Sequence, residues 1–374
     1  MNSFKIGIVT FHAAENFGSA LQAFALQYLL KKEGYTAEII NCVLKSDMEQ
    51  YKLFRTQYYK ERPKAFLGDI AYFRRNFERK YVYKKFQKKY LTLSKEKFYI
   101  GKNDLKYLNE IYDTFICGSD QIWNLNCTND FIPEFFLCFV NNKRKKIAYA
   151  PSMPEIVPSK YYERIKTALK TFDAISVREY QTIDYLKNDV GVDNEITQVV
   201  DPTLLLESQW YINIFSLKKK KGERYIFVYI LEDKENMNQI INMAIKTSQE
   251  IGVKIKYIFI RKIKEFKNCE FLLGIGPREF LDLIYNAEYV ITNSFHASVF
   301  SIHFEKPFCV FSRSGSQARM IDLLEKLELN NNLFQNNGCD SYFWMDSKAD
   351  ENTKNILEII RKQSVNFLID NLVK

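Results

Sequence analysis

The chain has 374 residues, 47% of them hydrophobic and 15% aromatic, and carries a formal net charge of +9. Because this length exceeds what one hydrophobic core usually serves, we expect two globular domains. No stretch reaches ~18 uninterrupted apolar residues, so no transmembrane helix is expected, and the start MNSFKIGIVTF predicts a strand rather than a signal peptide. Seven cysteines without a CxxC pair or disulfide-like spacing favour a reducing cytoplasm over a disulfide-rich secreted class.

The positive charge is concentrated in one segment. Residues 52–102 contain 16 basic and 4 acidic residues, a surplus of 12 that exceeds the surplus of the whole chain. Apolar residues recur there at helical spacing, at Phe66, Ile70, Phe73, Phe77 and Tyr81. This pattern predicts an amphipathic helix that packs on the first domain and keeps a solvated basic face. The alternative is a face that meets anionic lipid head groups or a pyrophosphate-linked acceptor, whereas nucleic acid is disfavoured because no module that binds it is visible.

Strand-like and helix-like segments alternate through the first half of the chain. The predicted strands are Phe4–Phe11, Ala37–Cys42, Ile111–Cys117, Ile147–Ala150, Ala174–Val177 and Ile196–Val200. The predicted helices are Ser19–Glu33, which has an amphipathic pattern, Tyr161–Thr171 and Tyr180–Asn188. Such alternation is typical of a parallel sheet covered by helices on both faces.

The second half repeats this alternation after a charged run, KKKKG at Lys218–Gly222, which predicts a linker. The predicted strands are Arg224–Leu231, Lys254–Ile260, Tyr289–Ile291 and Phe308–Phe311. The predicted helices are Lys234–Glu250, Arg278–Asn286, one that contains His296, Ala318–Leu327, and one or two within Thr353–Leu372.

These elements predict an α/β fold with two Rossmann-like domains that face a central cleft. We place the N-terminal domain at 1–206, with a basic helical insertion at about 52–102, and a linker at 207–223. The C-terminal domain follows at 224–345, and a helical tail at 346–374 ends the chain.

The most informative segment is Tyr289–Pro307, YVITNSFHASVFSIHFEKP. A short apolar strand runs into Asn293 and Ser294, which are residue types that begin helices, and His296 follows in the first turn. In open α/β sheets, ligands bind where a strand ends and a helix begins. The free N–H groups of a helix start favour an anion there. The histidine is therefore a candidate functional residue beside an anion site, and the plain alternative is a core histidine.

Other predicted strand ends carry polar residues in the same position. After the first strand, Gly18 can take a strained turn and Ser19 can cap the helix. Arg178 follows a later strand and can hold a carboxylate or phosphate, or form a surface ion pair with Glu179. Taken alone, each signal fits an ordinary turn, but together they predict polar groups along the rim of the cleft. The acceptor or cleft candidates are Asn16, Gly18, Ser19, Gly118, Ser119, Asp120 and Gln121.

Metal and nucleotide motifs are not visible. No HxH, HExxH or cysteine cluster has ligand spacing, so no metal site is expected. The run GIGPRE at Gly274–Glu279 lacks the third glycine of a dinucleotide fingerprint, and GxxxxGK[ST] and GxSxG do not occur. Of the other histidines, His12 ends the first strand, where it is expected to be solvated in a turn, with a position facing the cleft as the alternative. His303 is expected to pack in the core.

Five motifs together resemble the polysaccharide pyruvyl transferase family, over roughly Lys5–Leu329. They are Asn16–Gln27, Ile116–Asn124, Ser176–Leu186, Val200–Leu206 and Thr292–Phe308. The resemblance implies two Rossmann-like domains arranged as in GT-B glycosyltransferases. It also implies phosphoenolpyruvate as the donor and a sugar of a lipid-linked capsule or exopolysaccharide precursor as the acceptor. The implied product is a pyruvate ketal, and no cofactor is implied beyond phosphoenolpyruvate as co-substrate.

The same resemblance assigns roles to single residues. His296 matches the family's catalytic histidine, and Arg178 matches an arginine that holds the donor. Many relatives have Arg-Leu before the histidine, where this chain has Ser294 and Phe295, so another arginine is expected to supply that contact. The donor-binding candidates are Arg178, Asn293, Ser294, Arg313 and Arg319.

Two other functions stay open from the sequence. One is a GT-B-type glycosyltransferase that uses a nucleotide sugar, for which Glu279 and Asp282 are candidate ribose-binding carboxylates. The other is a non-enzymatic scaffold of a polysaccharide assembly complex. In each case the expected location is the cytoplasm, with a peripheral contact at the inner face of the membrane as one option for the basic segment.

Overall fold

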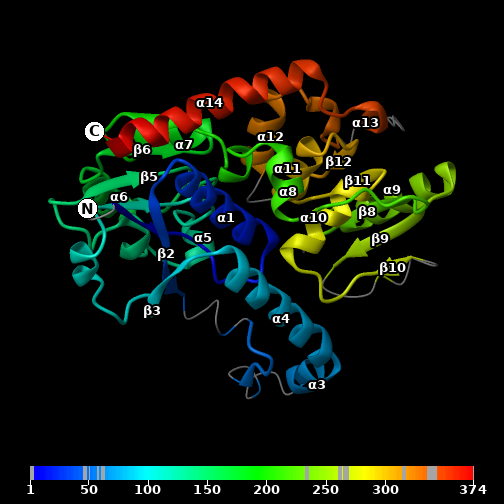
Figure 1. Cartoon of the computed structure of the whole chain (residues 1–374), viewed down its shortest axis with the longest axis horizontal. Helices are drawn as coiled ribbons and strands as arrows, with labels where there is room; N and C mark the ends of the chain where they lie inside the picture. The colour runs from blue at the N-terminus through cyan, green and yellow to red at the C-terminus, as the bar shows by residue number, and fades with distance from the viewer. Residues whose placement is uncertain are drawn as a thin grey trace. The chain divides into compact units, whose positions relative to one another are not determined.

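The computed structural model describes residues 4–44, 49, 51–56, 59, 64–231, 236–259, 263, 269–313, 317–334 and 343–373 (Figure 1). Two compact units make up the chain. Unit 1 comprises Met1–Leu205 and Ile360–Lys374, and unit 2 comprises Leu206–Ile359. Among the described residues, none of the helices combines the length and the apolar character that crossing a membrane requires.

Unit 1 is built on a seven-stranded sheet in the order β3-β2-β1-β4-β5-β6-β7, and every pair of neighbours is parallel. The strand order reverses between β1 and β4, as in doubly wound Rossmann folds. The strands are β1 (Lys5–Val9), β2 (Thr36–Val43), β3 (Leu93–Tyr99), β4 (Thr114–Cys117), β5 (Lys145–Ala148), β6 (Ala174–Val177) and β7 (Ile196–Gln198). The sequence did not predict β3, because three of its seven residues LSKEKFY are charged and only two are buried at this edge of the sheet.

Helices form much of the connections between these strands and cover the sheet. They are α1 (Phe17–Lys32), α3 (Lys64–Ala71), α4 (Phe73–Tyr90), α5 (Leu125–Thr128), α6 (Tyr162–Leu169), α7 (Tyr180–Asn188) and the end of α14 (Glu351–Val373). Short 3-10 helices are η2 (Lys106–Glu110), η3 (Pro133–Phe136), η4 (Ser159–Tyr161) and η5 (Pro202–Leu204).

The first helix, α1, is buried along nearly its whole length. Thirteen of its 16 residues are buried, because β2, η5 and α4 all contact it. Helix α4 packs on it through Tyr83, whose ring stacks on Phe17, and through Phe86, whose ring meets Phe24 edge-on. The predicted amphipathic character of this helix is therefore wrong, since three segments cover it instead of one.

The basic segment also packs differently from the prediction. The apolar stripe that includes Phe66, Ile70 and Phe77 was expected to face the first domain, but its side chains are exposed. The face of α4 that does pack carries Tyr83 and Phe86, in the second half of the helix. Figure 1 shows α3 and the first turns of α4 extending away from the unit 1 sheet, beyond the reach of α1.

Unit 2 repeats the topology on a smaller scale. Its five parallel strands have the order β10-β9-β8-β11-β12, with the reversal between β8 and β11. The strands are β8 (Tyr225–Tyr229), β9 (Lys254–Ile258), β10 (Glu270–Phe271), β11 (Tyr289–Thr292) and β12 (Phe308–Val310). The helices are α8 (Ser208–Ile214), α9 (Met237–Ile251), α10 (Pro277–Asn286), α11 (Phe295–His303), α12 (Gln317–Lys326), η6 (Asn330–Asn332), α13 (Phe343–Asp346) and the start of α14. The prediction of two Rossmann-like α/β domains is confirmed.

The unit boundaries differ in two places from the predicted domain limits. The predicted linker 207–223 contains α8, whose Tyr211 packs edge-on against Phe300 with ring centroids 5.0 Å apart, so this range belongs to unit 2. The predicted tail 346–374 is divided between the units, because α14 continues from unit 2 into unit 1. In unit 1, Val200 N donates to Ser364 Oγ over 3.0 Å. The predicted helix start at Lys234 and strand end at Ile260 lie outside the described residues.

Candidate functional site

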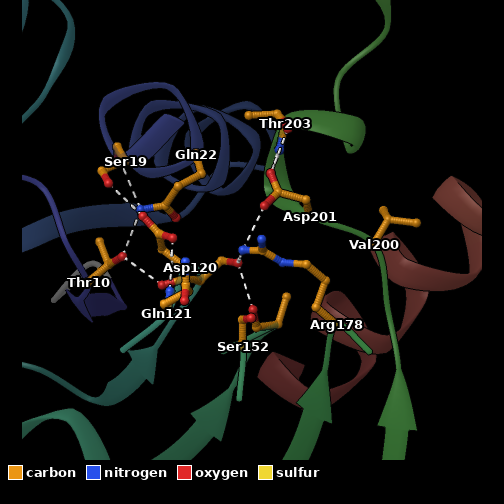
Figure 2. Close-up of polar contacts among 12 residues, drawn as sticks. Thr10, Ser19, Gln22, Asp120, Gln121, Ser152, Arg178, Val200, Asp201 and Thr203 are labelled. Atoms are coloured by element: carbon orange, nitrogen blue, oxygen red, sulfur yellow. Dashed lines mark hydrogen bonds and ion pairs between the residues drawn. The ribbon is translucent and has the colours of Figure 1, made fainter. Parts of the chain in front are cut away.

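Polar side chains gather at the carboxyl edge of the unit 1 sheet (Figure 2). Thr10 follows β1, Asp120 follows β4, Ser152 follows β5, Arg178 follows β6 and Asp201 follows β7. The first two flank the point at which the strand order reverses. Ligands of open α/β sheets bind in the crevice at this point, so these side chains lie where a ligand site is expected.

Hydrogen bonds tie the two sides of the reversal point together. Thr10 Oγ1 donates to the Ser119 carbonyl over 3.1 Å, and Gln22 Nε2 donates to Thr10 Oγ1 over 2.9 Å. Ser19 Oγ donates to Asp120 Oδ2 over 2.6 Å, which links the start of α1 to the loop after β4. All of these side chains are buried, so the predicted residues Ser19, Ser119 and Asp120 are brought together in one network.

The start of α1 differs from the prediction in detail. Asn16, not Ser19, is the N-cap, and its Oδ1 accepts from Ser19 N over 3.2 Å. Gly18 therefore lies inside the first helical turn instead of in a strained turn. The helix begins earlier because Asn16 is itself a preferred capping residue.

Gly118, at the end of β4, occupies a position that no other residue fits. Its φ is +110°, and a Cβ atom built there would lie 2.1 Å from the Tyr149 carbonyl oxygen. The following Asp120 also has a positive φ, 70°, and its Oδ1 accepts from Gln121 N over 2.9 Å. Its carbonyl accepts from Ser152 N over 2.9 Å, which fixes the loop after β4 against the loop after β5.

Arg178 forms a buried ion pair with Asp201. Arg178 NH2 lies 2.7 Å from Asp201 Oδ2, with side chains only 5% and 0% exposed, and it donates to Ser119 Oγ over 2.6 Å. Asp201 Oδ1 in turn accepts from Thr203 N over 2.9 Å at the start of η5. The pair thus joins the ends of β6 and β7 to the loop after β4.

The surface ion pair between Arg178 and Glu179, one interpretation of the sequence, is wrong. Glu179 is buried, and its carboxylate accepts from Ser152 Oγ over 2.5 Å and from Thr182 Oγ1 over 3.2 Å. Consecutive residues at a strand end point in opposite directions, so Arg178 and Glu179 reach different neighbours.

At the point where the strand order of unit 2 reverses, the side-chain amide of Asn293 connects the two neighbouring strand ends. Asn293 Oδ1 accepts from Leu231 N over 2.8 Å, and its Nδ2 donates to the Leu231 carbonyl over 3.0 Å. This joins the end of β11 to the segment after β8. Ser294 is the N-cap of α11, as its residue type predicted, and its Oγ accepts from Ala297 N over 3.4 Å.

His296 is the second residue of α11 and is 8% exposed. Its ring meets the Phe295 ring edge-on, with centroids 5.2 Å apart. The guanidinium carbon of Arg319, a buried residue of α12, lies 5.7 Å from the centroid of the same Phe295 ring. Arg319 therefore lies beside the residue that precedes the histidine, whereas Arg313 is half-buried in the segment after β12.

The two remaining histidines have structural neighbours. His303 packs between Tyr211 and Phe300, with ring centroids 5.2 and 5.6 Å away, which confirms the predicted core role. His12 was expected to be solvated but is 2% exposed, with Nδ1 3.1 Å from the Thr10 carbonyl and Nε2 3.2 Å from Asn41 Oδ1. Burial lowers the pKa of His12 below its ordinary value, although both hydrogen bonds oppose the shift.

Several members of the unit 1 network were missed by the sequence reasoning. They are Thr10, Ser152 and Thr203. Most of them stand within a few positions of a strand's carboxyl end, and that placement was the available signal. In the part of the chain that the structure describes, no group of three or more His, Cys, Asp or Glu side chains is placed to hold a metal ion.

The buried pair makes a testable contribution to stability. We expect Arg178→Met and Asp201→Asn each to lower the free energy of unfolding by about 3–5 kcal/mol, because each leaves the other charged group buried. Urea denaturation measures the loss. The double variant should lose clearly less than the sum of the single losses, since the two residues are in contact.

Arg224→Met is the matched control for this experiment. Arg224 NH2 lies 2.6 Å from Glu288 Oε1, but these side chains are 66% and 29% exposed. An exposed pair contributes about 0–1 kcal/mol. Equal losses in the control and in Arg178→Met would contradict the importance given to burial.

Solved structures share the two-unit fold at low sequence identity. A co-structure of S. aureus MnaA with UDP has a TM-score of 0.54 at 10% identity and covers 99% of this chain and 98% of that chain. UDP-GlcNAc 2-epimerase from Neisseria meningitidis, bound to UDP-GlcNAc, has a TM-score of 0.52 at 9% identity and covers 98% and 100%. UDP-GlcNAc 2-epimerase from Methanocaldococcus jannaschii has a TM-score of 0.51 at 13% identity and covers 96% and 93%. At such identities the likeness concerns the fold alone, and it confirms the predicted GT-B-like class.

No curated protein matches the chain. A model of the family described as polysaccharide pyruvyl transferase matches residues 16–315, a range that takes in the carboxyl ends of the strands of both sheets except β1. Asn16, Asp120, Arg178 and His296 all lie inside the matched range. Since the match covers most of the sequence, the chain belongs to the polysaccharide pyruvyl transferase family.

Proposed function

We propose that this protein moves the pyruvyl group of phosphoenolpyruvate onto a sugar of a surface-polysaccharide precursor and forms a pyruvate ketal. Family membership supports pyruvyl transfer. The observation that carries the proposal is the place of His296, a buried imidazole in the first turn of α11 next to the reversal point of unit 2. A proton-transferring group beside a helix N-terminus suits an anionic substrate that must be protonated on carbon.

The reaction requires protons to move in a defined way. A proton added to the methylene carbon C3 of the donor leaves C2 electron-poor, and a sugar hydroxyl attacks C2 and loses its own proton. The bond from C2 to the phosphate oxygen then breaks, phosphate leaves with the electron pair, and a second hydroxyl attacks C2 and loses its proton. Of the two hydroxyl protons, one replaces the proton added to C3 and the other is carried by the phosphate. One donor and one sugar diol thus give one ketal and one inorganic phosphate, with no oxidant or reductant. In this scheme His296 is the general acid that protonates C3.

Donor contacts in unit 2 are proposed at the start of α11 and at Arg319. The first N–H groups of a helix attract anions, and Ser294 fixes the start of this helix. Arg319 lies against Phe295, the neighbour of Ser294, at which many relatives carry their arginine, and a guanidinium binds phosphate or carboxylate through paired hydrogen bonds. The side-chain amide of Asn293 binds Leu231, so its predicted donor contact is better described as support for the loop.

The residues of unit 1 are proposed to contact the acceptor, with Arg178 as a further donor contact. Hydroxyl and carboxylate groups such as those of Ser19 and Asp120 suit the hydroxyls of a sugar. The proposed acceptor is a lipid-linked oligosaccharide. Ion pairing with Asp201 holds the Arg178 guanidinium in one orientation, which is favourable for two-point recognition of an anion.

Nucleotide-sugar transfer is the competing activity. The solved relatives named above include proteins bound to UDP and UDP-GlcNAc, and they share the fold. The ribose-binding candidates offer less support, because Asp282 Oδ2 accepts from Lys220 Nζ over 2.5 Å and Glu279 lies 3.9 Å from Arg278 NH1. Among the contacts of the described residues, none favours the scaffold alternative specifically.

The donor can be identified directly. Incubation with phosphoenolpyruvate and a lipid-linked oligosaccharide pool from the host should release phosphate and add a ketal-linked pyruvate to the glycan, detected by mass spectrometry. Phosphate release should depend on the acceptor, since the sugar hydroxyl is the nucleophile. Parallel reactions with UDP-sugars and GDP-sugars are the control, and consumption of a nucleotide sugar alone would overturn the proposal.

The two histidines of α11 make a matched pair. His296→Gln and His296→Ala should lower kcat by ~10²–10⁴-fold, the typical contribution of a placed proton donor, and leave the donor KM nearly unchanged. His303→Ala should lower the melting temperature, because the ring packs between two aromatic residues, and leave kcat near the wild-type value. The reverse result would show that the catalytic histidine is assigned wrongly.

The arginine that replaces the family contact can be tested in the same assay. Arg319→Gln should raise the KM for phosphoenolpyruvate about 10- to 100-fold, as expected for loss of a hydrogen bond between charged groups worth roughly 1.5–3 kcal/mol. Arg319→Lys keeps the charge, so its KM for phosphoenolpyruvate should lie between the values of the wild type and of Arg319→Gln. Arg313→Gln is the control and should change KM little; a larger effect there would transfer the role to Arg313.

A further inference from the structure

Helices α3 and α4 expose a continuous apolar ridge. The ridge consists of Phe66, Leu67, Ile70, Phe73, Phe77 and Tyr81, whose side chains are 39% to 65% exposed. Steps of three and four residues keep such side chains on one helical face. The face continues across the junction of the two helices, because Tyr72 N donates to the Gly68 carbonyl and Asn76 N to the Tyr72 carbonyl.

The ridge is held in place by a buried carboxylate. The Asp69 side chain is 0% exposed and accepts from Arg55 Nε over 2.8 Å, from Arg55 N over 2.7 Å and from Tyr59 OH over 2.9 Å. Burial alone would raise the pKa of Asp69, but the hydrogen bonds from Arg55 and Tyr59 outweigh it and lower this pKa. Arg55 and Tyr59 are thereby fixed to α3, and Phe54 packs against Phe73 with ring centroids 5.5 Å apart.

Basic side chains flank the ridge. Residues 64–90 contain nine basic and two acidic residues, and both acidic side chains are in ion pairs, Asp69 with Arg55 and Glu78 with Arg74. The exposed face continues beyond the ridge, toward the body of unit 1, with Lys84, Lys85, Lys88 and Lys89. Apolar side chains at one end and lysines at the other are the arrangement of interfacial membrane-binding helices.

We propose that this ridge docks the protein on an anionic membrane surface. The apolar side chains enter the boundary between head groups and acyl chains, and the lysines lie at the phosphates of anionic lipids. The positive charge around the ridge argues against binding to the same face of a second copy of the protein, because two strongly basic surfaces repel each other. The aliphatic side chains of Leu67 and Ile70 decide against nucleic acid, since they have no role in contacting a phosphate backbone. The inference does not depend on the chemistry proposed above.

Vesicle sedimentation of the full chain tests the proposal without any substrate. Binding should be strong to vesicles of phosphatidylcholine mixed with phosphatidylserine and at least tenfold weaker to phosphatidylcholine alone. It should weaken as salt rises, because the Debye length falls from ~30 Å at about 0.01 M to ~10 Å at about 0.1 M. Absence of binding at low salt, or equal binding to both vesicles, would overturn the proposal.

Matched variants separate the ridge from general hydrophobicity. The ridge variant Leu67→Gln, Ile70→Gln, Phe77→Gln should bind anionic vesicles at least tenfold more weakly. The control variant Ile156→Gln, Leu273→Gln, Ile359→Gln changes side chains that are equally exposed, from 45% to 78%, and should bind like the wild type. A third variant, with Lys84, Lys85, Lys88 and Lys89 changed to Gln, should lose the salt dependence. Because all of these positions are exposed, unchanged melting temperatures are expected.

Two other binding partners of the ridge, a second copy of the protein and nucleic acid, would be recognised by separate measurements. A dimer in sedimentation velocity that dissociates in the ridge variant would assign the ridge to self-association and overturn the membrane proposal. Binding to single-stranded nucleic acid but not to anionic vesicles would overturn it as well. If the control variant lost as much vesicle binding as the ridge variant, the membrane proposal would also be overturned.

Discussion

The reversal of strand order next to β1 and next to β8 is the constraint on which both candidate sites depend. At such a point the chain leaves two neighbouring strands toward opposite faces of the sheet, and no helix covers their carboxyl ends. Side chains connect the two strand ends instead. In unit 1 the bond from Thr10 to the Ser119 carbonyl joins the two strand ends, and in unit 2 the Asn293 amide does so at Leu231. The same topology therefore produces a polar, pre-organised edge twice.

The two edges are supported in different ways. In unit 1 the support is ionic, because the buried pair of Arg178 and Asp201 connects the ends of β6 and β7 and reaches the loop after β4 through Ser119. In unit 2 the support comes from the side-chain amide of Asn293 and from the N-cap Ser294. His296 follows in the first turn of α11. A buried charge pair is costly to desolvate and is favourable only with good geometry and further hydrogen bonds. The bonds to Ser119 and Thr203 provide these.

Most strands were predictable from the sequence, because buried parallel strands are short apolar runs. Charged edge strand β3 was not, since nothing in LSKEKFY marks a buried segment. For the sites, residue types at strand ends indicated where Ser19, Asp120 and Arg178 lie, but not their partners. Asp201 is distant from Arg178 in sequence, whereas Glu179 is adjacent and yet binds Ser152. For the basic segment, the spacing identified the apolar stripe of Phe66, Ile70 and Phe77, but the prediction that this stripe packs on the first domain is wrong, because its side chains are exposed.

Helix α14 makes the two units interdependent during evolution. Unit 1 is not encoded by one continuous stretch, because the segment from Ile360 onward completes it after the whole of unit 2. Ser364 accepts from Val200 N, and Arg361 Nε donates to the Leu204 carbonyl, so residues that follow unit 2 in the sequence make contacts near residue 200. A single recombination event between the units would give unit 1 a foreign helix. Exchange of this unit between relatives therefore requires two crossovers, or the last helix must be inherited together with the first 205 residues.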